Sequence, residues 1–138
     1  MIKVETFGML DVAKVNPVLK SDKDVKNYSF LTFDGDLYLI SNTITGDDAY
    51  REDIVIPAGE YLNGFMVEAW KGQKLVIDGK HIDGGASTLE KGDILVAQED
   101  GTLKKGVATQ GVYLVVTDTK TTLTEAAVKA KVAVGAGE

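Results

Sequence analysis

The densest group of side chains that could do chemistry lies in the polar segment NTITGDDAYRED, residues 42–53. Its carboxylates could supply the oxygen ligands that calcium prefers; they are Asp47, Asp48, Glu52 and Asp53, with Glu60 close by. Their spacing lacks the EF-hand pattern and its glycine after the acidic positions. We therefore expect no metal and interpret the segment as a solvated loop. An ordered functional loop and a plain surface loop both stay open.

The other side chains with catalytic potential are isolated from one another. The single histidine, His81, lies in a turn between Asp78 and Asp83, where we interpret it as a surface residue rather than a base. One histidine, no cysteine and no Gly-x-Ser-x-Gly elbow argue against a nucleophilic hydrolase. Nothing marks two of the 21 acidic residues as a glycosidase pair. We predict a protein that is not an enzyme and uses no cofactor.

Composition narrows the class of partner. A chain of 138 residues corresponds to one domain, and its net charge is −6. Nucleic acids and anionic membranes bind clusters of lysine and arginine, whereas the 15 basic residues here are scattered. No run approaches the roughly 18 apolar residues of a membrane span. We expect no nucleic acid and no membrane partner, and a protein that is made in the cytosol and kept there or released by lysis.

Turn signals set the expected architecture. Asp34-Gly35-Asp36 separates the alternating run Tyr28–Phe33 from Leu37–Ile40, and Asp100-Gly101 separates two further runs that can pair. Such signals recur roughly every eight to twelve residues, which is typical of a sandwich or barrel rather than of βαβ units. The sequence therefore predicts an all-β fold, a small β-sandwich or β-barrel-like domain with an extended N-terminal arm.

We expect strands near both ends of the chain. Residues 2–7 alternate with strand period and could form a first strand or an arm that pairs with another chain. We divide the chain into residues 1–20, the N-terminal arm and first strand, and residues 21–138, a single β-domain. Near the other end, residues 118–122 read as a polar turn and 128–134 as a strand, with a helical turn allowed at 125–127.

The segment YLNGFMVEAW, residues 61–70, raises the question of an interface. Read as one strand, it places Phe65 and Trp70 on opposite faces. Only one face of a single sheet can be core, so one of these two aromatic side chains is expected at a partner surface.

One stretch carries a resemblance to a known family. Residues 92–97 read Gly-Asp-Ile-Leu-Val-Ala, residues 100–103 read Asp-Gly-Thr-Leu, and the valine-rich run 128–134 closes the chain. This order resembles the small head decoration, or capsid cement, proteins of tailed bacteriophages, in which a "GD-apolar" strand leads to a hairpin and a closing valine-rich strand. The resemblance covers about the last third of the chain, residues 87–134.

The resemblance implies a non-enzymatic virion structural protein. Such proteins bind the outside of a phage capsid across junctions between capsomers, often as trimers. The implied partners are the major capsid protein and further copies of the chain, and the implied location is the capsid exterior after synthesis in the host cytoplasm. A terminal segment can add a strand to a neighbouring sheet, and many weak contacts over a shell add up to avidity.

We expect the partner interface in the N-terminal arm, the acidic loop and one aromatic side chain. The residues are Ile2, Val4, Phe7, Met9, Leu10, Asp47, Asp48, Tyr50, Arg51 and Trp70. Two other functions are compatible with the sequence: another phage virion component, such as a head fibre base or tail protein, and a carbohydrate-binding β-module that uses Trp70 and nearby aromatic residues.

Overall fold

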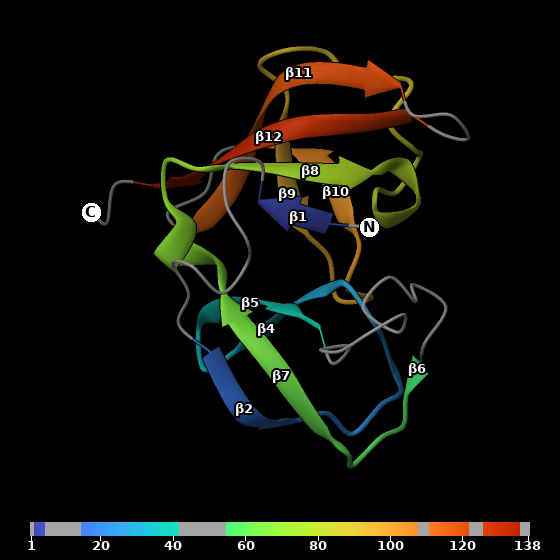
Figure 1. Ribbon diagram of the computed structural model, residues 1–138, viewed down its shortest axis with the longest axis vertical. Coiled ribbons are helices and arrows are strands. Elements are labelled where there is room, and N and C mark those ends of the chain that lie inside the picture. Colours follow the sequence, from blue (N-terminus) through green and yellow to red (C-terminus); the bar gives the residue numbers. More distant parts are fainter. Residues whose placement is uncertain (1, 5–14, 42–54, 108–110, 122–125, 136–138) are drawn as a thin grey trace.

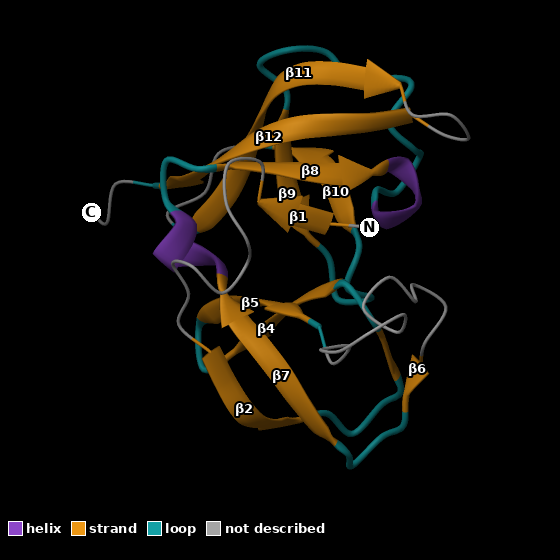
Figure 2. Ribbon diagram, in the orientation of Figure 1, coloured by secondary structure: helices purple, strands orange, loops and turns teal. Residues whose placement is uncertain are grey.

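The computed structural model describes residues 2–4, 15–41, 55–107, 111–121 and 126–135. Strands dominate this part of the chain, and its two helices are short (Figure 2). The predicted all-β fold is confirmed. The elements are β1 (Ile2–Val4), β2 (Val15–Lys20), β3 (Val25–Lys26), β4 (Ser29–Phe33), β5 (Asp36–Ile40), β6 (Val55–Ile56), β7 (Tyr61–Met66), η2 (Val67–Trp70), β8 (Lys74–Asp78), η3 (Gly79–His81), β9 (Ile94–Ala97), β10 (Leu103–Gly106), β11 (Val112–Thr121) and β12 (Ala126–Val134).

The described strands form two main sheets and one small ribbon (Figure 1). The large sheet has the order β1-β8-β12-β11-β9-β10, the small sheet has the order β2-β7-β5-β4, and β3 pairs with β6. All these pairs are antiparallel. Past η3, Ile82 bridges to Leu103 of β10, so the large sheet curls toward closure. None of the described helices has the length and apolar character needed to cross a membrane.

The predicted hairpin around Asp34-Gly35 is confirmed as β4–β5. Phe33 pairs with Asp36, which leaves a two-residue turn. Asp34 and Gly35 have φ angles of 50° and 84°. Positive φ at both turn positions gives the turn twist that matches paired strands, and Asp-Gly adopts it readily.

The predicted hairpin at Asp100-Gly101 is confirmed as β9–β10. Gln98 donates its backbone N–H to Thr102 O at 2.9 Å, and Gly101 donates to Gln98 O at 3.1 Å. Gly101 has a φ of 91°, the left-handed conformation that three-residue hairpin loops require. The Asp100 carboxylate accepts from the Thr102 backbone N–H at 2.9 Å and from its hydroxyl at 2.6 Å.

The last two strands are longer than the sequence indicates. The predicted polar turn at residues 118–122 is wrong for 118–121, because β11 continues to Thr121 after an irregularity between Val116 and Asp118. The predicted strand 128–134 is confirmed, but it already begins at Ala126, which removes the helical turn allowed over 126–127. Backbone pairing between the two strands outweighs the helix preference of alanine there.

The segment after β7 does not continue as a strand. The 3₁₀ helix η2 turns the chain so that Phe65 and Trp70 point into the same core, where their rings stack at 6.0 Å between centroids. The prediction that one of them faces a partner is therefore wrong. That prediction assumed that side chains alternate between two faces along the whole segment, whereas the strand ends at Met66.

The main core lies between the two main sheets. It unites Ile77, Leu95, Leu114 and Val128 of the large sheet with Phe30 and other residues of the small sheet and η2. A second, smaller cluster covers the opposite face of the small sheet; its buried members are Val25, Tyr38, Ile40, Ile56 and Leu62. The small sheet is thus apolar on both faces.

Candidate functional site

A cleft of about 410 Å³ opens where two strands of the large sheet separate. β9 and β11 pair only through Leu114 with Leu95 and Val115 with Ile94. Beyond these pairs, the tip of the β9–β10 hairpin contacts the small sheet, where Phe30 donates its N–H to Gly101 O at 2.8 Å. The β9–β10 hairpin therefore diverges from β11 toward the small sheet. The cleft opens between β9, β11 and the small sheet.

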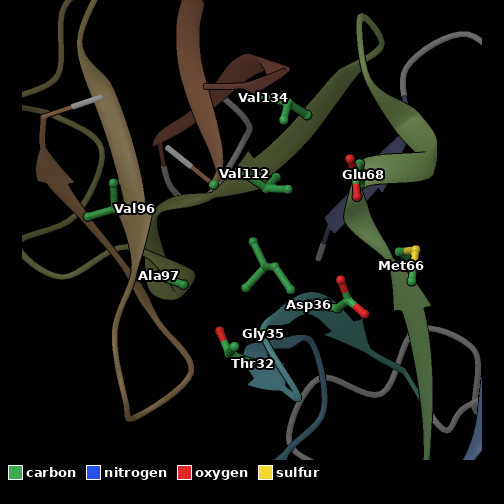
Figure 3. A pocket seen from close by; sticks show the side chains of 11 residues that line it. Thr32, Gly35, Asp36, Met66, Glu68, Val96, Ala97, Val112 and Val134 are labelled. Carbon is green, nitrogen blue, oxygen red and sulfur yellow. The ribbon is translucent and has the colours of Figure 1, made fainter. Parts of the chain in front are cut away.

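The walls of this cleft come from both sheets (Figure 3). Val96 and Ala97 lie on one wall, Met66 and Glu68 on the opposite wall, and Val112 with Val134 between the two walls in this view. The β4–β5 turn closes the bottom. The lining mixes apolar side chains with polar groups; the remaining residues that contribute to it are Thr32, Gly35, Asp36, Leu37 and Gly111.

Two carboxylates give the cleft its charge. Asp36 follows the β4–β5 turn and Glu68 lies in η2, and both side chains are exposed. Within the described part of the chain, neither carboxylate takes part in an ion pair or a side-chain hydrogen bond. Among the residues that the structure describes, no lysine or arginine lines the cleft. The cleft is therefore suited to a cation that also carries apolar surface.

His81 faces a second, wider hollow of about 1080 Å³. Its ring meets the edge of Tyr28 at 5.9 Å between centroids, and only 9% of the residue is exposed. The interpretation of His81 as a surface residue is therefore wrong. Burial, and secondarily the charge of Lys80, lowers the pKa of His81 to about 4. The imidazole is neutral near pH 7 and too weak a base for general-base catalysis there.

Tyr28 itself has strained backbone geometry. Its φ of 63° is uncommon for a bulky residue. Hydrogen bonds on both sides hold this conformation: Tyr28 donates its N–H to Ile40 O at 2.8 Å, and the Ser29 hydroxyl donates to Lys26 O at 2.6 Å. The Tyr28 ring packs against His81, so the residue before β4 contacts η3.

The outer face of the large sheet is a third candidate surface. Alternation leaves Lys74, Lys131, Val115 and Ile94 in one row across β8, β12, β11 and β9, on the side away from the core. We call this row the outer row. Val115 and Ile94 are partly exposed, and Lys131 is exposed. The outer row thus combines apolar surface with positive charge on an acidic protein.

Two of the residues expected at a partner interface are buried, and most of the others lie outside the described ranges. Ile2 pairs with Ile77 of its own chain and is 1% exposed, and Trp70 is fully buried. These two assignments are wrong for the folded chain, because both side chains are needed to fill the core. Trp70 consequently presents no face to a sugar. Val4 lies in β1, but the structure does not describe its side chain. The other expected interface residues lie outside the described ranges; they are Phe7, Met9, Leu10, Asp47, Asp48, Tyr50 and Arg51.

The question of a first strand or an arm is answered for residues 2–4. They form β1, which pairs with β8 of the same chain, so this part is a first strand. Residues 5–14 lie outside the described ranges. The acidic loop, residues 42–53, also lies outside them. Among the residues that are described, no three His, Cys, Asp or Glu side chains come together as metal ligands.

Sequence reasoning missed the acidic cleft. Asp36 reads as a turn residue, and Glu68 reads as a member of a strand that in fact ends at Met66. No local pattern places these two residues near Val96 or Val134. The one available signal is the glycine before Val112, because it marks where β11 begins and where the separation from β9 starts.

Comparison with known proteins adds no relative. No family model, no curated protein and no solved structure matches this chain.

Proposed function

We propose that the protein is a non-enzymatic virion structural protein that binds the outside of a phage capsid and holds capsomers together. The observation that carries the proposal is the outer row, Lys74, Lys131, Val115 and Ile94, on a sheet whose other face is core. A surface that combines apolar side chains with lysine suits contact with another protein. The resemblance of residues 87–134 to head decoration proteins supports the same proposal.

The expected partners are the major capsid protein and further copies of this chain, with a trimer as one possible assembly. Lys131 of the outer row would face acidic side chains on the shell, whereas Lys74 Nζ already lies 3.6 Å from Asp118 Oδ2. The remaining acidic surface keeps the decorated particle soluble. Individual contacts can be weak, because repetition over a shell multiplies them. The proposed location is therefore the capsid exterior.

The test is cosedimentation with empty capsids assembled from the major capsid protein of the same genome. Light scattering first gives the mass of the free protein. At saturation, the bound protein should reach a fixed, countable ratio to the capsid subunits. Failure to sediment with capsids would overturn the proposal, and a location at the tail in electron micrographs of virions would replace it with the tail-protein alternative.

Matched double variants test the outer row. Val115 and Lys131 are cross-strand partners on the large sheet, and Val55 and Lys26 are cross-strand partners on the ribbon. Val115→Glu with Lys131→Glu should weaken capsid binding at least tenfold, through lost apolar contact and reversed charge. Val55→Glu with Lys26→Glu changes the net charge equally and should bind like the unchanged protein. Equal loss in both would show that net charge alone governs binding.

A further inference from the structure

The acidic cleft contains strand backbone that the described strands of its own sheet leave unpaired. Gln98 bonds to Thr102 across the β9–β10 hairpin, so the next residue along the ladder, Ala97, turns its N–H and C=O away from β10. On the other side, Gly135 donates to Gly111 O at 3.0 Å, which turns the backbone groups of Val112 away from β12. Both sets of groups point into the cleft, because the β9–β11 ladder stops at Leu95 and Leu114.

The two carboxylates stand beside this open backbone. Asp36 and Glu68 reach the cleft from the small sheet and η2, and the described part of the lining contains no lysine or arginine. Met66, Val112 and Val134 supply apolar surface next to them (Figure 3). An aliphatic stem that ends in a positive charge matches this arrangement, since the stem can cover the apolar wall while the charge reaches the carboxylates.

We propose that this cleft binds an extended segment of a partner protein that carries a lysine or arginine side chain. The segment pairs its backbone with Ala97 and Val112, in the manner of an added strand. Its basic side chain lies along Met66 and ends between Asp36 and Glu68. The proposal is independent of the capsid function, because it uses a different surface from the outer row.

The chemistry of the lining favours this occupant over others. An anion would meet two carboxylates and, within the described lining, no basic group. A divalent cation would find two acidic side chains among the described lining residues, fewer oxygen ligands than calcium takes. A purely apolar segment would leave both carboxylates desolvated without a partner, which costs free energy.

Short peptides provide the direct test. The probe is the acetylated and amidated pentapeptide Gly-Val-Lys-Val-Gly, titrated into the full chain labelled with ¹⁵N. Amide shifts are expected at Ala97, Val112, Asp36 and Glu68. A peptide with norleucine in place of lysine keeps the stem and removes the charge, and should bind about tenfold more weakly. n-Butylamine alone supplies the cation without a backbone and should also bind more weakly than the lysine peptide.

Variants of the carboxylates complete the test. Asp36→Asn with Glu68→Gln should reduce lysine-peptide affinity about tenfold and leave norleucine-peptide affinity unchanged. Both side chains are exposed, so the fold should tolerate the change. The matched control is Asp22→Asn with Glu60→Gln, two exposed residues outside the cleft lining that change the net charge equally.

Several results would overturn the proposal. Equal binding of the lysine and norleucine peptides would remove the role of the carboxylates. Butylamine binding as tightly as the peptide would remove the added strand. Amide shifts confined to other surfaces would move the site. None of these outcomes bears on capsid cosedimentation, so the two proposals stand or fall separately.

Discussion

In the large sheet, buried apolar side chains line one face, whereas the small sheet carries them on both. β12 alternates between buried Val128, Ala130 and Val132 and the lysines at 129 and 131. β5 instead buries three consecutive residues: Leu39 joins the main core, while Tyr38 and Ile40 join the second cluster. The difference shows that an unbroken apolar run of strand length can mark a sheet covered on both sides.

The comparison also locates what joins the sheets. Trp70 and Phe65 stack in the shared core, and Tyr28 meets His81 at its border. If these contacts hold two otherwise different layers together, substitutions at the junction should cost more stability than substitutions within either sheet. The following predictions test that ranking, from the largest effect to the smallest.

The largest effect is expected at Trp70. Trp70→Ala should lower the free energy of unfolding by about 4 kcal/mol, because it removes a fully buried ring and its stacking on Phe65. Urea unfolding followed by circular dichroism measures the loss. Trp70→Phe keeps an aromatic ring and should cost less, which covers the case in which the alanine variant does not fold. A loss below about 1 kcal/mol in Trp70→Ala would contradict a junction role.

Acid should weaken the junction at His81. Its pKa is about 4 in the folded protein against an ordinary 6.5, so between these values the unfolded chain binds a proton that the folded chain does not. The stabilisation is complete above pH 6.5 and falls as the pH drops toward 4. The expected loss between pH 7 and 4.5 is about 2 to 3 kcal/mol.

The variant His81→Gln isolates this contribution from that of the carboxylates. Unfolding free energies of both proteins are measured at pH 7 and 4.5. The variant should lose less stability over this interval than the unchanged protein. Identical pH dependence in the two proteins would argue against the buried, neutral histidine.

A pair of glycines compares packing within the two sheets. At Gly64 in the small sheet, a Cβ atom would meet Leu19 Cδ1 at 2.5 Å and Tyr38 Cδ1 at 2.9 Å. At Gly106 in the large sheet, it would meet Val96 Cγ2 at 2.8 Å, on the open outer face. Gly64→Ala should therefore cost about 2 kcal/mol and Gly106→Ala less than half of that. Thermal unfolding measures the loss of stability in each variant. Equal losses would contradict the expectation that a covered sheet face tolerates an added methyl group less well than an open face.

The smallest effects are expected at surface cations. The Lys20 ammonium lies 4.3 Å from the Tyr61 ring centroid, and Lys74 Nζ lies 3.6 Å from Asp118 Oδ2. Lys20→Ala and Lys74→Ala should each cost about 0.5 kcal/mol. Urea unfolding measures both. A loss at either lysine that matches the loss at Gly64 would break the ranking.

Local signals were sufficient for the hairpins, because the turn residues Asp34-Gly35 and Gly101 adopt conformations that few other residues favour. Local signals were insufficient where contacts with residues distant in sequence determine the structure. Trp70 enters the core through the 3₁₀ helix η2, which the hydrophobic pattern of the sequence does not indicate. Residues 118–121 stay extended because β12 pairs with them. His81 is buried, and its ring packs against Tyr28, which lies far away in sequence.

The candidate site was beyond local reading for the same reason. The cleft depends on where β9 leaves β11, and therefore on the contact between Phe30 and Gly101. Asp36 and Glu68 become neighbours of the cleft only after both sheets are in place. The resemblance of residues 87–134 concerns strands of the large sheet and carries no information about η2.

The position of β12 in the large sheet has a consequence for synthesis. β12 lies between β8 and β11, and it is the last described strand to leave the ribosome. Until then β8, with β1 beside it, has no partner on its other edge. The small sheet, whose strands all lie within Val15–Met66, can pair much earlier. β12 therefore inserts between two strands that precede it in the chain, and a chain stalled or truncated before β12 would expose the edges of both strands to aggregation.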